Sequence, residues 1–134
     1  MGSWLILVVG LGYAAIGVVF AWPTTYVQVW RLGAWVLSGG LCGAHILYER
    51  FGLRAVPRSA ALHVALAVAL GALGLAAAAN IHSLSVGATE RQHRLLLIAL
   101  IAWPVITGLP AFLVAWGISG ILARLGVSRP VGLR

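Results

Sequence analysis

The chain has 134 residues, of which 62% are hydrophobic and only 8% are charged, and its formal net charge is +7. The length fits a single domain, whereas a soluble domain usually carries about 25% charged residues, so the composition excludes an ordinary soluble protein. The positive charge comes from nine arginines at the ends of apolar runs. This placement is typical of residues that orient membrane helices, and we do not expect nucleic-acid binding.

Four long uncharged runs cover residues 1–30, 32–48, 59–89 and 95–123. About 20 mostly apolar residues are enough for a helix to cross the ~30 Å hydrocarbon layer. Only helices or closed barrels satisfy every backbone polar group in lipid, and these runs lack the alternation of barrel strands. The sequence therefore predicts an all-α membrane protein, a single domain over residues 1–134 that forms a four-transmembrane-helix bundle with short loops.

The first predicted helix covers residues 3–22 and is ended by Pro23, because the residue before a proline disfavours helical geometry. It lacks the basic start of a signal peptide, so we expect an uncleaved span. Thr25 and Gln28 have the spacing of a capping box, which predicts a second helix over residues 26–50. The third predicted helix covers residues 59–80, and a polar loop follows over residues 81–88.

The fourth predicted helix covers residues 90–123 and starts at a second capping box, Thr89 and Gln92. Pro104 and Pro110 interrupt it, with Gly108 between them. Each proline removes an amide donor and clashes with the carbonyl four residues earlier. The pattern predicts a strong kink or two half-helices, with the hydroxyl of Thr107 satisfying a freed carbonyl.

Small residues recur along one face of the third predicted helix and, as a Gly-x-x-x-Gly motif, in the second. Such residues let helix backbones approach closely in lipid. The predicted packing residues are Ala65, Ala69, Ala72 and Ala76, with Gly39 and Gly43. We expect the third helix to be the least lipid-exposed, covered by the second and fourth helices or by another chain; both a tight centre of the bundle and a homodimer seam are open.

A polar stripe runs along the second predicted helix, because Ser38, Cys42, His45 and Glu49 follow steps of four, three and four residues. His63 lies about one turn inside the same short loop, so the sequence predicts that His45 and His63 lie close together. Ionisable groups inside a membrane are candidate functional residues.

Histidines are also candidate ligands of a haem or a metal ion. His45 and His63 form one possible pair, and His82 and His93 form another on the opposite side of the membrane. All four lie near predicted interfaces, where imidazole can reach water or headgroups. We therefore predict no cofactor, with haem, pigment or quinone binding kept as alternatives.

The arginines are distributed unequally between the two predicted sides of the membrane. One side holds six of them (Arg50, Arg54, Arg58, Arg124, Arg129 and Arg134), and the other holds three (Arg31, Arg91 and Arg94). Arginine is enriched in cytoplasmic loops, so both termini are expected in the cytoplasm. The predicted location is the bacterial inner membrane, with anionic lipid headgroups contacting the arginine-rich side.

The sequence contains no nucleophile–base arrangement, phosphate loop, zinc spacing or pair of carboxylates, which argues against an enzyme. The favoured interpretation is a small non-catalytic accessory subunit of a larger membrane complex, such as an electron-transfer or light-harvesting complex, or a self-associating helical bundle. One alternative is a small oligomeric transporter or channel that uses the kinked fourth helix and the polar stripe. A second alternative is a b-type haem or metal-binding membrane protein.

Overall fold

The computed structural model describes residues 3–21 and 25–125, and within these ranges the chain is helical without any strand. The helices are α1 (Ser3–Ala21), α2 (Val27–Leu47), the short π-helix η1 (Tyr48–Gly52), α3 (Pro57–Ser85) and α4 (Glu90–Arg124). The all-α prediction is confirmed. Residues 22 and 23, where the first helix was expected to end, lie outside the described residues.

Three of these helices, α1, α3 and α4, are long and apolar enough to cross a membrane. The α2 helix, which contains Arg31, does not meet the same criterion within the described residues. The structure therefore supports an integral membrane protein with three candidate spans, and a fourth span at α2 stays a prediction.

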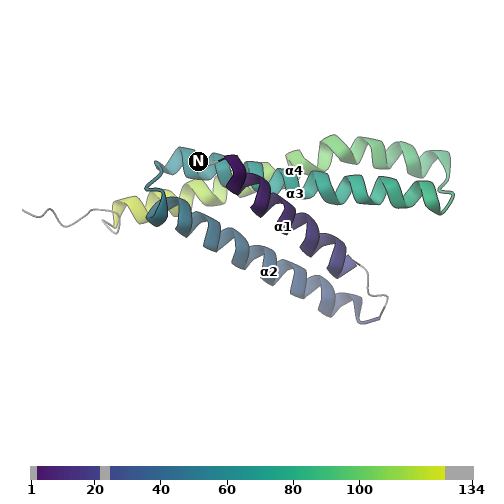
Figure 1. The fold of residues 1–134 in the computed structure, drawn as a ribbon, viewed down its shortest axis with the longest axis horizontal. Coiled ribbons are helices and arrows are strands. Elements are labelled where there is room, and N and C mark those ends of the chain that lie inside the picture. The colour runs from purple at the N-terminus through teal and green to yellow at the C-terminus, as the bar shows by residue number, and fades with distance from the viewer. Residues whose placement is uncertain (1–2, 22–24, 126–134) are drawn as a thin grey trace, which may run out of the picture.

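The four helices form two hairpins that diverge from one another (Figure 1). The α3 and α4 helices lie side by side along the long axis of the molecule, whereas α1 crosses α3 and α2 follows α1 away from that pair. Of the apolar stretch of α3, 39% is buried, compared with 6% for α1 and 6% for α4. The third helix is thus the most covered of the candidate spans, as predicted, but its cover comes from α1 and α4 and only slightly from α2.

The crossing of α1 over α3 depends on glycine. A Cβ atom added at Gly71 would lie 2.3 Å from the Cβ atom of Tyr13 and 3.1 Å from the carbonyl oxygen of Gly10. One added at Gly74 would lie 2.9 Å from the Cβ atom of Ala14. Any larger residue at these positions would force the two helices apart, so the close crossing needs glycine here.

The contact between α3 and α4 uses the predicted alanine face. A Cβ atom at Gly108 would lie 3.2 Å from that of Ala69 and 3.4 Å from the carbonyl oxygen of Ala65. Ala72 and Ala76, farther along the same helix, are also buried. The alanine part of the packing prediction is therefore confirmed, with Gly108 acting at a close approach.

The glycines of the same prediction are not packed within the described chain, and their contact with another chain stays a prediction. Gly39 and Gly43 of α2, like Gly40 beside them, face open space. A Cβ atom added at any of the three would have no heavy atom within 4 Å, apart from the local backbone of its own helix. Any close packing of this face requires an atom from outside the described residues.

One predicted helix end agrees with the structure, and two others differ from it. At α4 the Thr89 amide donates to the Gln92 side chain at 3.0 Å and the Gln92 amide donates to the Thr89 hydroxyl at 3.3 Å, which confirms this capping box. The predicted box at Thr25 is wrong, because α2 starts after Tyr26 in a left-handed conformation (φ 52°) without a side-chain cap. The α3 helix also continues to Ser85, where Gly87 with φ 68° follows its end.

The α4 helix runs as one continuous α-helix through Pro104 and Pro110, without the break of the half-helix alternative. A bend at this place stays a prediction. The Thr107 hydroxyl donates to the Trp103 carbonyl at 2.8 Å, and the usual partner of that carbonyl is the Thr107 amide. The carbonyls freed by the prolines lie four residues before each of them, so Thr107 does not take the role expected from the sequence.

Candidate functional site

Three ionisable side chains from three helical elements meet at the end of the molecule where α2 turns into α3. Glu49 of η1 is fully buried, and its Oε1 atom lies 3.0 Å from Nδ1 of His63 in α3. The same oxygen lies 3.6 Å from Nε2 of His45 in α2, which is also buried. The carboxyl group therefore lies between two imidazoles, and the predicted proximity of His45 and His63 is confirmed.

The π-helix η1 explains how two consecutive charged residues are both turned inward. The Leu53 amide donates to the Tyr48 carbonyl, five residues back, at 3.1 Å. Successive residues of a regular α-helix point about 100° apart, and the wider π turn changes that spacing. Glu49 and Arg50 are consequently both buried, and the Arg50 guanidinium donates to the Ala55 carbonyl.

Several polar atoms of this region are buried without a hydrogen-bond partner among the described residues. They include Oε2 of Glu49 and Nδ1 of His45, and the hydroxyl of Ser119 in α4 belongs to the same class. Buried polar groups in folded proteins nearly always have a partner. Unsatisfied atoms on Glu49 and His45 therefore leave these two side chains able to bind a proton or a further polar group.

The ionisable cluster lies next to apolar side chains from three helices. Ile46, Val64 and Ala115 are buried against one another, and Cys42 packs against the same group. The Cys42 thiol in turn lies close to the Tyr13 hydroxyl of α1. In such surroundings, charge interactions are stronger than in water.

Three of the four residues of the predicted polar stripe lie together in the structure. Cys42, His45 and Glu49 lie on the inner face of α2 and η1, and His63 joins them from α3. Ser38 is half-buried one turn farther along α2, and its side chain makes no hydrogen bond within the described ranges. It does not belong to the cluster.

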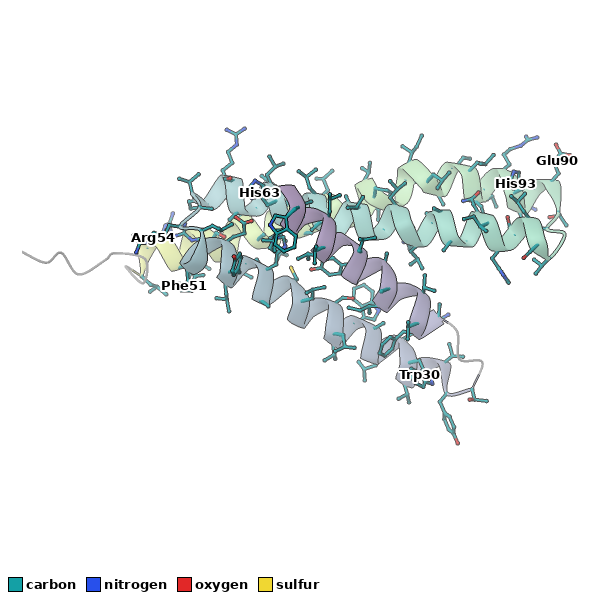
Figure 2. The ribbon with its side chains drawn as sticks, viewed as in Figure 1. Trp30, Phe51, Arg54, His63, Glu90 and His93 are labelled. Atoms are coloured by element: carbon teal, nitrogen blue, oxygen red, sulfur yellow. The ribbon has the colours of Figure 1, made fainter. Side chains whose placement is uncertain are left out.

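The other two histidines lie at the far end of the α3–α4 pair. His82 is exposed and His93 is half-buried, and Figure 2 shows His93 beside Glu90 at the end opposite to His63. Glu90 pairs with Arg94 at 3.2 Å on the exposed surface. Exposed pairs of this kind contribute little to stability, and nothing among the described residues joins the two pairs of histidines.

Sequence reasoning missed Asn80, a buried polar residue that links α3 to α4. Its side-chain nitrogen donates to the Ala76 carbonyl at 2.9 Å and to the Leu96 carbonyl at 2.8 Å. The carbonyl of Asn80 accepts a bond from the Ser83 hydroxyl at 2.7 Å. A lone amide at the end of an alanine-rich helix was the available signal, because an amide in an apolar helix requires a partner.

Within residues 3–21 and 25–125, no group of three or more His, Cys, Asp or Glu side chains could hold a metal ion. What the buried cluster offers chemically is hydrogen bonding and the exchange of protons between a carboxyl group and two imidazoles.

No known protein family, characterised protein or solved structure matches this chain.

Proposed function

We propose that this protein is a small non-catalytic helical subunit of a membrane assembly, built with further copies of itself or with other membrane proteins. The observation that carries the proposal is the open face of α2, formed by Gly39, Gly40 and Gly43. Trp35 on the same helix is 79% exposed. A helix with this much uncovered surface is suited to contact a helix of another chain.

The crossing of α1 over α3 shows why an open glycine face is suited to contact another helix. Helix association in lipid is driven by van der Waals packing, and small residues allow the backbones to approach. This chain already uses that device at Gly71, where α1 fills the space in front of the glycine. The glycines of α2 offer the same kind of surface without an occupant from the described chain.

We further propose that α2 is a fourth span and that both termini lie in the cytoplasm of a bacterial inner membrane. Arg50, Arg54 and Arg58 then lie on the cytoplasmic side, where anionic headgroups are available. Reporter fusions after Arg134 and at Gly87 test this arrangement. A cytoplasmic signal from the first and a periplasmic signal from the second is expected, and the reverse pattern would overturn the orientation.

The assembly is tested by filling the open face. The double variant Gly39→Leu/Gly43→Leu should keep the thermal stability of the protein in detergent, because no described atom opposes these positions. It should lose the higher-mass species seen for the parent after mild detergent extraction and cross-linking. Gly117→Leu is the matched control, since Gly117 of α4 is equally open.

Two results would contradict the proposal. One is a parent protein that is extracted only as an isolated monomer. The other is a double variant whose higher-mass species are unchanged, while Gly117→Leu removes them. The second result would transfer the interface from α2 to α4.

The two alternative functions receive less support from the geometry. The transporter or channel hypothesis uses a kinked fourth helix and the polar stripe, and α4 runs through Pro104 and Pro110 without interruption. The haem or metal hypothesis needs a ligand set, and the described residues offer no group of three or more candidate metal ligands. A Soret band in pure protein that disappears in His45→Ala would put the haem hypothesis first.

A further inference from the structure

A series of proton-carrying side chains leads from the surface into the molecule. His63 has 28% of its side chain exposed, whereas the side chains of Glu49 and His45 are 0% and 1% exposed. Cys42 lies three residues before His45 on the same helix face, and it approaches Tyr13 of α1. Exposure thus falls from His63 to Glu49 and His45, while Cys42 and Tyr13 are half-buried.

We propose that His63, Glu49 and His45 form a proton-binding site that exchanges protons with water through His63. The ligand of this site is the proton itself. The inference does not depend on the assembly role proposed above, because it concerns the inner face of α2 and the assembly concerns the outer one.

The geometry defines the order of transfer. A doubly protonated His63 passes its Nδ1 proton to Oε1 of Glu49 across 3.0 Å, which leaves a neutral imidazole and a neutral carboxylic acid. The acid then gives its proton to Nε2 of His45, which becomes an imidazolium beside a restored carboxylate. The 3.6 Å separation of these two atoms requires a small side-chain rotation or a bridging water. One proton enters from water at the outer imidazole, and the total charge of the site rises by one.

The surroundings of Glu49 favour a site of this kind. Its second oxygen, Oε2, and Nδ1 of His45 are buried without a hydrogen-bond partner within the described ranges. Arg50, the neighbouring charged group in η1, directs its Nη1 atom to the Ala55 carbonyl. His45 of α2 and His63 of α3 are the imidazoles that face Glu49, and α4 contributes the uncharged Ala115 to the apolar group around Ile46.

The chain offers an unusually clean test because it has only two acidic side chains. In a Glu90→Gln background, Glu49 is the sole side-chain carboxyl group, and its ¹³C-labelled carboxyl resonance can be followed by NMR in detergent micelles. Interacting groups titrate in coupled steps, so this resonance should shift in more than one step with pH. His63→Asn should remove one step, and His82→Asn should remove none.

A second measurement tests the entry route. Transfer of the protonated protein into D₂O shifts the infrared carbonyl band of the Glu49 acid as its proton is replaced. His63→Phe should abolish the fast phase of this shift, whereas His82→Phe should leave it intact. Glu49→Gln in the same background should remove the band and confirm its assignment.

Distinct results would overturn the inference. The Glu49 resonance could be constant over the pH range of the folded protein, or it could shift in one step that neither His45→Asn nor His63→Asn changes. Either result would show that Glu49 only holds the helices together. Loss of the proton-linked steps on addition of Zn²⁺ at stoichiometric concentration would show a metal site instead. Thermal stability close to that of the parent establishes for each variant that the fold is retained.

Discussion

The two glycine-bearing surfaces of this protein are put to different uses. On α3, Gly71 and Gly74 face α1 so closely that a side chain would collide with Tyr13 and Ala14. On α2, Gly39, Gly40 and Gly43 face no described atom at all. Glycine therefore lies at an occupied helix–helix contact on α3 and at an uncovered surface on α2.

The comparison shows that a small-residue pattern gives a helix the capacity for close packing without specifying its partner. Packing in lipid depends on how well two surfaces fit, and the fit depends on both helices. At Gly71 the second surface belongs to the same chain. At Gly40 the protein itself supplies none within the described residues, and substitutions at the two positions should differ accordingly.

The largest effect is expected for Gly71→Leu. Its Cβ atom alone would lie 2.3 Å from that of Tyr13 and 3.1 Å from the carbonyl oxygen of Gly10. The α1 helix must move away, and we expect a loss of about 3 kcal/mol in the free energy of unfolding. Reversible denaturation in mixed micelles measures this loss. A stability equal to that of Gly40→Leu would remove the distinction between the two surfaces.

A somewhat smaller effect is expected where α3 meets α4. Ala69→Leu places three further carbon atoms against Gly108, whose Cβ position lies 3.2 Å from that of Ala69. Overpacking of this kind costs about 2 kcal/mol, and Ala72→Leu should act in the same direction. Purification yield, apparent size and melting temperature report the change, and normal values for both variants would show that this face is not tightly packed.

The polar link between α3 and α4 should contribute less than the small-residue contacts. Asn80→Leu removes the bond to the Leu96 carbonyl, which keeps its own helical partner. Hydrogen bonds of this kind contribute about 1 kcal/mol. Thermal unfolding measures the loss, with Ser85→Ala as a control because its exposed hydroxyl bonds only within α3. Equal losses in both variants would contradict a link between the helices.

The smallest effect is expected for Gly40→Ala in isolated protein. The added methyl group meets open space, and alanine favours a helix over glycine by up to about 1 kcal/mol. The free energy of unfolding should therefore stay constant or rise slightly. A marked fall would mean that α2 is already covered in the preparation, which would support the assembly by a different route.

Local capping signals in the sequence were right at one helix and wrong at another. Thr89 and Gln92 form the predicted box because each side chain bonds to the other residue's backbone. The similar pair at Thr25 and Gln28 fails because Tyr26 takes a left-handed conformation. The Thr-x-x-Gln spacing predicts a capping box equally in both places. The backbone conformation of the residues that lead into the helix decides whether the box forms.

Partners that are distant in the chain were harder to predict. The alanine face of α3 was identified, but α1 was overlooked as its neighbour. Gly10 and Gly17 of α1 lie against Leu70 and Leu75, and their spacing of seven residues was the signal available. The sequence also left open whether α4 is continuous, since prolines are tolerated in apolar helices when neighbouring groups compensate.

The candidate site was predicted in its main part, because a short loop brings His45 and His63 together. The central place of Glu49 between them was not foreseen, since it depends on the π turn of η1. Ser119 and Asn80 were missed for another reason. A single serine or asparagine gives no periodic pattern, and its burial is decided by the helix that packs against it.

The π turn also fixes the permitted length of the chain at this corner. A π-helix accommodates one residue more per turn than an α-helix, so deleting Tyr48 would remove the residue that the wide turn accommodates. Glu49 and Arg50 would then take the usual α-helical spacing of about 100°, and the two side chains would no longer both be buried. Insertions between Leu53 and Ala55 would move the Ala55 backbone away from its bonds with Glu49 and Arg50, although this segment is mostly exposed. The number of residues between α2 and α3 is therefore constrained by the burial of Glu49 and Arg50.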